Sequence, residues 1–295
     1  MTLSLAIQAI ITGISEGSIY ALVAIGFNII YNSTGIINFT QGEYVVLGGI
    51  LTSFFVTKFS LPILIVIPMA ILIVVALAVI FERVAIYPVR NASVLTLVII
   101  TIGGAILIRG LTMIFMGKNA FFLKPFIDGE PVNILGAGFQ IQTLWIIGAS
   151  LFLSLLLLLF FRYTITGKAM QACSFNPEAA SLTGIHVQRM VMLSFAISAF
   201  IGAAGGAVLI PLHPMMYYHG AVLGLKGFAA AVLGGLGRGG GAIIGGLLIG
   251  LSENFAKIYS TEYKDAIAIL ILLLVLFIKP SGILGKAAEE RYKKI

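Results

Sequence analysis

The sequence predicts an all-α polytopic membrane protein, and three observations support this fold class. Of its 295 residues, 60% are hydrophobic and only 10% are charged, whereas soluble domains carry about 25% charged residues. The mean hydropathy is +1.11. Apolar runs of bilayer-spanning length follow one another along the chain, with polar loops between them. We therefore expect residues 1–295 to form a single transmembrane domain of about eight to ten helices, since each span needs about 20 apolar residues.

Nine candidate spans can be placed in order along the chain. The first contains Gly13, Glu16 and Gly17, which predicts a helix that is broken or tilted. The seventh is short, so it either crosses fully or forms a re-entrant segment. The candidate ranges are 3–31, 36–56, 61–81, 94–116, 144–161, 190–212, 221–236, 242–258 and 266–278.

Glycine is unusually common, with 34 residues, and much of it lies in 202–206 and 224–250. Close helix packing through small residues is one interpretation, and helix breaks beside a pathway are the other. A faint repeat accompanies this pattern. Tyr31, Leu47, Gly48 and Gly49 recur 186 residues later as Tyr217, Leu233, Gly234 and Gly235, which is compatible with two related halves.

The loop charges predict the orientation in the membrane, because Lys and Arg concentrate on the cytoplasmic side. With the N-terminus outside and the C-terminus in the cytoplasm, the loops inside hold more than twice as many cations as those outside. Those inside are Arg83, Arg90, Arg162, Lys168, Arg189, Arg238, Lys279, Lys286, Arg291, Lys293 and Lys294; those outside are Lys58, Lys118, Lys124, Lys257 and Lys264. Residues 117–142 then form the long extracytoplasmic loop, which we expect to contain turns and short extended pieces.

A polar segment, GKAMQACSFNPEAASLTGIHVQ at 167–188, interrupts the apolar sequence and lies in the predicted cytoplasmic loop 163–189. The sequence of this segment predicts a short capped helix. Asn176 suits the cap, Pro177 the first helical position, and Glu178 the positive end of the helix dipole. Gly184 can end the helix in a left-handed conformation. A capped helix in a membrane-protein loop indicates a surface offered to a partner.

Four ionisable residues lie inside predicted spans, where charge is costly and therefore faces a cavity or a partner. They are Glu16, Glu43, Arg109 and Lys226. Glu43 ends the run 38–43, NFTQGE. We expect Asn38 and Gln41 to share one helical face, and Phe39, Gly42 and Glu43 another. Asn38, Gln41 and Glu43 are candidate pathway residues near the cytoplasmic end, or alternatively helix caps and interhelical hydrogen-bonding groups. Glu16 is a further candidate pathway residue. Arg109 is better interpreted as the structural partner of a carboxylate or carbonyls.

The sequence offers no catalytic constellation and no cofactor site. The run 234–241, GGLGRGGG, lacks the lysine and hydroxyl of a phosphate-binding loop. His186, His213 and His219 do not have metal-ligand spacing, and no catalytic, metal or nucleotide residues are assigned. We therefore do not expect an enzyme. Any ATP energy would have to come from another chain.

Four segments carry a resemblance to a known family. They are GIINFTQGEYVVLG at 35–48, the loop 167–185, GLKGFAAAVLGGLG at 224–237, and KPSGILG at 279–285. The chain resembles the permease subunits of bacterial ABC importers for branched-chain and other hydrophobic amino acids. The lysine-containing GLKGF form is more similar to the first of the two paired permeases.

The resemblance implies a role for each part of the chain. Glu178-Ala179-Ala180 with Gly184 matches the E-A-A-x-x-x-G core of the family's coupling loop, so Asn176, Pro177, Glu178, Ala179, Ala180 and Gly184 would contact an ATPase. The downstream Ile-x-Leu-Pro of the wider pattern is missing. The implied partners are a second permease, two ATPase subunits that bind ATP and Mg²⁺, and an extracytoplasmic binding protein, all at the bacterial inner membrane.

Three alternatives remain open from the sequence. The cargo could be a related small molecule such as urea or an amide. The chain could be a stand-alone secondary transporter or channel, which predicts paired ionisable residues at mid-depth. An intramembrane enzyme is disfavoured by the missing catalytic set.

Overall fold

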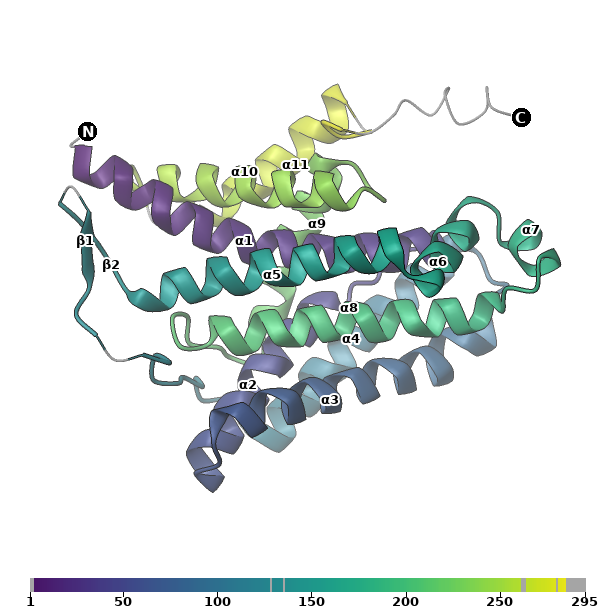
Figure 1. Cartoon of the computed structure of the whole chain (residues 1–295), viewed down its shortest axis with the longest axis horizontal. Coiled ribbons are helices and arrows are strands. Elements are labelled where there is room, and N and C mark those ends of the chain that lie inside the picture. Colours follow the sequence, from purple (N-terminus) through teal and green to yellow (C-terminus); the bar gives the residue numbers. More distant parts are fainter. Residues whose placement is uncertain (1–2, 128, 135, 261–263, 280, 285–295) are drawn as a thin grey trace.

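The computed structural model of the chain describes residues 3–127, 129–134, 136–260, 264–279 and 281–284. Helices dominate it (Figure 1). In chain order the elements are α1 (Leu3–Thr34), α2 (Gln41–Phe59), α3 (Ile63–Phe81), the π-helical turn η1 (Glu82–Ile86), the 3₁₀ turn η2 (Tyr87–Val89), α4 (Val94–Met116), β1 (Val132–Ile134), β2 (Ala137–Phe139), α5 (Ile141–Tyr163), α6 (Ile165–Phe175), α7 (Pro177–Leu182), α8 (Val187–Leu209), α9 (His219–Gly234), α10 (Gly239–Lys257) and α11 (Lys264–Ile278).

The long first helix, α1, is continuous over 32 residues, so of the two alternatives the break at Gly13–Gly17 is excluded and the tilt stays a prediction. The small residues serve close packing instead. A Cβ atom added at Gly250 of α10 would collide with the backbone of Gly17 and with the carbonyl oxygen of Gly13. Because no side chain separates the two backbones there, α1 and α10 can pack tightly along their length.

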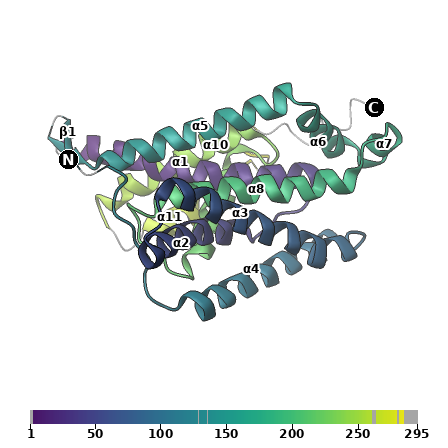
Figure 2. The same ribbon diagram turned by 60° about the horizontal axis from the view of Figure 1, so that its bottom comes forward.

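The interior and the periphery of the bundle are formed by different helices. In the most apolar 18-residue windows, 72% of residues are buried in α1 and 61% in α8, but only 28% in α4 and 22% in α5. Leucine, isoleucine and phenylalanine side chains project outward from α3, α4 and α5. Figure 2 shows α4 at the edge of the bundle. This distribution fits a membrane protein, in which lipid covers the outer helices.

Among the described residues, five helices are long and apolar enough to span a membrane: α1, the segment Ile63–Val89 that includes α3, α4, α5 and α8. Helices α2, α9, α10 and α11 overlap the remaining predicted spans but are shorter or more polar. The chain turns by 120° between α9 and α10, as in a broken span or a re-entrant loop. The expectation of about eight to ten spans therefore stays a prediction, as does the full crossing of 221–236.

The long loop 117–142 contains the turns and extended pieces that the sequence predicts. Strands β1 and β2 form an antiparallel hairpin in which Val132 pairs with Phe139. An isolated bridge between Phe121 and Met215 joins the loop to the connection between α8 and α9. Asp128 lies outside the described residues.

The two ends of the molecule differ in character. The hairpin lies beside the start of α1 at one end, and α6 and α7 lie at the opposite end (Figure 1). The tail residues Lys286, Arg291, Lys293 and Lys294 lie outside the described residues. The faint repeat is only partly equivalent in position. Leu47 and Gly48 lie inside α2 as Leu233 and Gly234 lie inside α9, but Gly49 is also helical whereas Gly235 follows the end of α9.

Candidate functional site

The segment 165–184 is built as two short helices rather than the single one expected. Helix α6 ends at Phe175, and Asn176 then adopts an extended conformation with ψ of 101°. The Asn176 side chain accepts a hydrogen bond from the backbone N–H of Ala179 at 3.0 Å, and Pro177 occupies the first turn. The predicted cap is therefore confirmed. Such a cap stabilises a helix by about 1 kcal/mol.

Helix α7 ends at Leu182, and Gly184, which follows its C-cap Thr183, has the left-handed conformation that the sequence predicts, with φ of +86°. The N–H of Ile185 donates to the carbonyl of Ala180 at 3.1 Å, which closes the C-terminal turn. Ala180 is buried, whereas Glu178 and Ala179 are exposed. A hollow of about 520 Å³, lined by Ser181 and residues 184–189, lies beside the helix.

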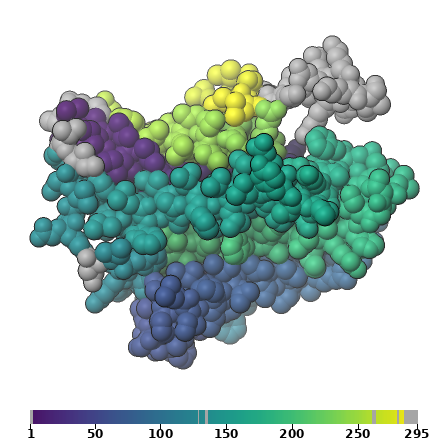
Figure 3. All heavy atoms as spheres, in the orientation of Figure 1, coloured from purple at the N-terminus to yellow at the C-terminus, as the bar shows by residue number. Residues whose placement is uncertain are grey.

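Two apolar side chains beside α7 escaped sequence analysis. Phe175 and Leu182 are each 88% exposed, and α6 and α7 project at one end of the molecule (Figure 3). Large apolar groups that project next to polar ones mark protein-docking surfaces. The signal was their place in the polar segment 167–188. It was incomplete, because Met170 of the same segment is buried in the core.

The run 38–43 is only partly helical. The prediction that Asn38 shares a helical face with Gln41, and Phe39 with Gly42 and Glu43, was therefore wrong. Helix α2 begins at Gln41. Before it, the N–H of Phe39 donates to Thr101 Oγ1 at 3.2 Å, and Thr101 Oγ1 donates to the carbonyl of Ile37 at 3.3 Å. The Phe39 ring packs against Phe27 and Phe228. Non-helical backbone thus enters the interior of the bundle, where a polar side chain from α4 partly satisfies it.

Asn38, Gln41 and Glu43 are all buried but have different partners. Asn38 Oδ1 accepts from Thr40 Oγ1 at 2.7 Å, while its Nδ2 atom has no hydrogen-bond partner among the described residues. Gln41 joins α2 to α8 through both the hydroxyl and the carbonyl of Ser198. The interpretation as interhelical hydrogen bonding is thus confirmed for Gln41.

Glu43 pairs with Arg109 across the gap between α2 and α4. The distance from Arg109 Nη2 to Glu43 Oε1 is 2.6 Å, and the Glu43 side chain is 3% exposed against 28% for Arg109. The expectation that Arg109 partners a carboxylate is confirmed. A buried carboxylate needs such a partner, since an isolated charge would be strongly disfavoured at this depth.

Glu16 belongs to a different cluster and is not brought together with Asn38, Gln41 and Glu43. Its carboxylate accepts from Lys257 Nζ at 2.7 Å and from Asn254 Nδ2 at 2.9 Å. His213 lies 3.9 Å from it. Burial lowers the pKa of His213, which lies in the loop after α8, although the Glu16 charge acts in the opposite direction.

A second set of charges surrounds Lys226 of α9. Its Nζ atom lies 2.7 Å from Glu253 Oε1 and 2.6 Å from Asp265 Oδ1, and Tyr20 donates to Glu253 Oε2 at 2.8 Å. Sequence analysis noted Lys226 but missed both acids. The signal for Glu253 was its place inside the apolar run 242–258. These pairs link α1, α9, α10 and α11.

Comparison with known proteins decides the family. The sequence profile of a family described as "Branched-chain amino acid transport system / permease component" matches residues 9–276. The chain belongs to this permease family. It is 34% identical to the high-affinity branched-chain amino acid transport system permease protein LivH of Escherichia coli (strain K12), over 97% of each chain. It is 31% identical to the corresponding protein BraD of Pseudomonas aeruginosa, again over 97% of each chain.

Among solved structures, PsaBC from Streptococcus pneumoniae in complex with Fab covers 93% of this chain and 91% of its own, at 15% identity and a TM-score of 0.49. That similarity is too low to inform function. The region matched to the permease family runs from Ala9 in α1 into α11, so both the α6–α7 segment and the polar interior lie within it.

Proposed function

We propose that this chain is the transmembrane permease subunit of an ABC importer that moves branched-chain or other hydrophobic amino acids into the cytoplasm. The observation that carries the proposal is the permease-family match along 9–276, combined with an exposed, capped helix at one end of the molecule. LivH and BraD are named for branched-chain amino acid transport, which supports the substrate class. The chain is proposed to be non-catalytic.

The partners follow from this role. A second, similar permease completes the pathway, two ATPase subunits bind ATP and Mg²⁺, and an extracytoplasmic binding protein delivers substrate. The α6–α7 segment is the proposed ATPase contact, through Asn176, Pro177, Glu178, Ala179, Ala180 and Gly184. Phe175 and Leu182 join this set because their exposed apolar surface would be buried by a docked partner.

Glu178→Arg combined with Gly184→Pro tests the coupling assignment. The first change reverses a charge at the contact, and the second places a proline where the left-handed φ of +86° excludes it. We expect ATP-driven uptake to be lost while membrane insertion persists. Uptake is measured with radiolabelled leucine in proteoliposomes that contain the partner subunits. Glu178→Gln, which removes charge without reversing it, is the control and keeps most activity. Unchanged uptake in the double variant would show that the α6–α7 segment is not the ATPase contact.

The substrate pathway is proposed to pass between α2 and α4, beside Glu43 and Arg109. Two features support this: Asn38 Nδ2 and Tyr44 Oη are buried without hydrogen-bond partners among the described residues, and the chain at 35–40 is not helical. Irregular backbone and unsatisfied polar atoms at membrane depth are typical of transport pathways. Glu16 is kept as a second, separate candidate.

Glu43→Gln and Asn38→Leu test the pathway. Each is expected to change the KM or maximal rate of uptake several-fold without loss of assembly, because each alters polarity without removing much volume. Normal transport in both variants would assign these residues to packing alone.

The alternatives have distinct outcomes. An importer for urea or amides predicts that those molecules, and not leucine, compete for uptake. A stand-alone secondary transporter predicts uptake by the purified chain without ATPase subunits, and no ATPase retained when the tagged chain is purified. The proposed location is the bacterial inner membrane, with the N-terminus outside and the C-terminus in the cytoplasm.

A further inference from the structure

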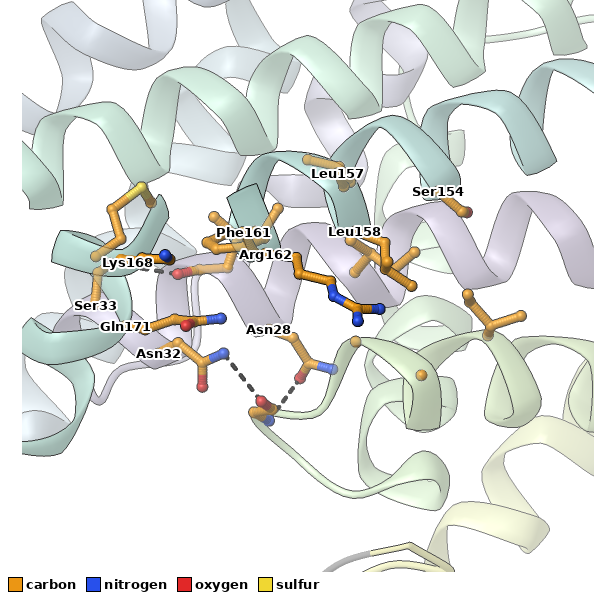
Figure 4. A pocket seen from close by; sticks show the side chains of 17 residues that line it. Asn28, Asn32, Ser33, Ser154, Leu157, Leu158, Phe161, Arg162, Lys168 and Gln171 are labelled. Atoms are coloured by element: carbon orange, nitrogen blue, oxygen red, sulfur yellow. Dashed lines mark hydrogen bonds between the residues drawn. The ribbon is translucent and has the colours of Figure 1, made fainter. Parts of the chain in front are cut away.

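A pocket of about 520 Å³ opens between α1, α5, α6 and the start of α10. Figure 4 shows side chains from three helices converging on it, with Asn28 and Asn32 from α1, Arg162 from α5, and Lys168 and Gln171 from α6. The pocket is separate from Glu43, from Glu16 and from α7, so the proposed function does not account for it.

The far wall of the pocket is held in place by hydrogen bonds. Asn28 Oδ1 accepts from the N–H of Gly237 at 2.9 Å, and Asn32 Nδ2 donates to the carbonyl of Gly237 at 2.9 Å. These bonds fix the turn between α9 and α10 against α1. The pocket is therefore a built feature of the fold, with a wall made from segments more than 200 positions apart in sequence.

The charge of the pocket is positive, and no acidic side chain among the described residues compensates it. Arg162 and Lys168 line it, and no lining residue is acidic. Among the described residues neither cation takes part in an ion pair, and the nearest recorded partner of Arg162 is the ring of Tyr163, 5.4 Å away. The Arg162 side chain extends across the pocket toward α10 (Figure 4). Two unpaired cations in one hollow favour an anion.

The pocket is also amphipathic. Besides the polar groups, Leu158, Phe161 and Ile243 line it, and Leu158 is 51% exposed. The pocket lies beside the last turn of α5, an apolar helix that ends with Arg162 and the exposed Tyr163. Basic and aromatic residues at the end of an apolar helix mark the membrane–water interface. An occupant at this depth would meet lipid-exposed apolar surface on one side and cations on the other.

We propose that this pocket binds a membrane phospholipid with an anionic headgroup. The phosphate lies between Arg162 and Lys168, the headgroup hydroxyls meet Gln171 and Asn32, and an acyl chain follows Leu158 and Ile243. Basic pockets between helices at the membrane surface have this lipid preference. A soluble anion would account for the two cations but not for the apolar surface that continues from them toward the bilayer.

Two kinds of variant test the proposal, with phosphatidylglycerol as the probe. Arg162→Gln with Lys168→Gln removes the charge. Gly240→Phe fills the pocket and keeps the charge, since a Cβ atom at Gly240 meets no atom within 4 Å. Matched controls are Arg90→Gln with Arg189→Gln, two exposed cations outside the pocket, and Gly148→Phe, an exposed open position on the same helix as Arg162.

The measurement is native mass spectrometry of the full chain, purified with any subunits that accompany it and titrated with phosphatidylglycerol or phosphatidylcholine. We expect the first variant to bind phosphatidylglycerol about 25-fold more weakly, because each basic group near an anionic lipid contributes roughly a factor of five. Gly240→Phe should also lose the bound lipid, and both controls should retain it. If the charge variant fails to fold, Gly240→Phe still tests whether the lipid binds in this pocket.

Three results would overturn the proposal. The first is equal retention of phosphatidylglycerol in wild type and in Gly240→Phe. The second is equal binding of phosphatidylcholine. The third is displacement of the lipid by millimolar inorganic phosphate, which would identify a soluble anion as the occupant.

Discussion

At the residue scale, most buried charges of the bundle are paired with an opposite charge, whereas Glu82 Oε2 is buried without a hydrogen-bond partner among the described residues. Glu43 meets Arg109, Glu16 meets Lys257, and Lys226 meets two carboxylates. Each pair joins residues far apart in sequence. The sequence could identify several of these charges as costly, but the distances between them depend on how the helices pack.

Lys226→Met is the clearest test of such a pair. It leaves Glu253, whose side chain is 2% exposed, without its closest cation, and stranding a buried charge costs about 3–5 kcal/mol. We expect a marked drop in the unfolding temperature of the purified chain in detergent. Combining it with Glu253→Leu should recover most of the loss, since no unpaired buried carboxylate then remains. Equal stability of the single and double variants would contradict this account.

At the element scale, glycine sets the distances between helices. The two sequence interpretations, close packing and helix breaks, both apply but at different positions. Gly17 and Gly250 pack α1 against α10 without interrupting either helix. Gly235 and Gly237, with φ of +100° and +85°, form the turn between α9 and α10.

Gly250→Ala and Gly110→Ala should therefore have opposite effects. A methyl group at Gly250 meets the backbone of α1, and such overpacking costs about 1–3 kcal/mol. Gly110 has open space around its Cβ position, so alanine there should be neutral or stabilise α4 by about 0.5–1 kcal/mol through helix propensity. Unfolding curves in detergent measure both. A similar loss in the two variants would show that packing against α1 is not the cause.

At the scale of the whole molecule, the two ends carry different structures. Arg162, Lys168 and the α9–α10 turn, three features predicted to be cytoplasmic, meet around one pocket. The hairpin and the start of α1 lie at the other end (Figure 1). This arrangement agrees with the charge asymmetry of the loops, since features on one predicted side lie together in space.

The chain's single cysteine, Cys173, makes the orientation easy to test. In a Cys173→Ser background, one cysteine is placed at the exposed Asn133 of β1 or at the exposed Ser181 of α7. A membrane-impermeant maleimide added to spheroplasts, with the inner membrane intact, should label the first and not the second. Both should be labelled after the membrane is opened. The reverse labelling pattern would show that the orientation in the membrane is opposite to the predicted one.

The sequence by itself determined the helical membrane class and the capped helix at 177–182, because composition, capping residues and apolar run length act locally. Its transport family was indicated by the resemblance of four segments to known permeases. Only the tertiary structure decided that α1 is unbroken, that the chain at 35–40 enters the interior before α2 begins, and which charges pair. It also revealed the cationic pocket between Arg162, Lys168 and the α9–α10 turn. These features depend on contacts between distant segments, and such contacts leave no local pattern in the sequence.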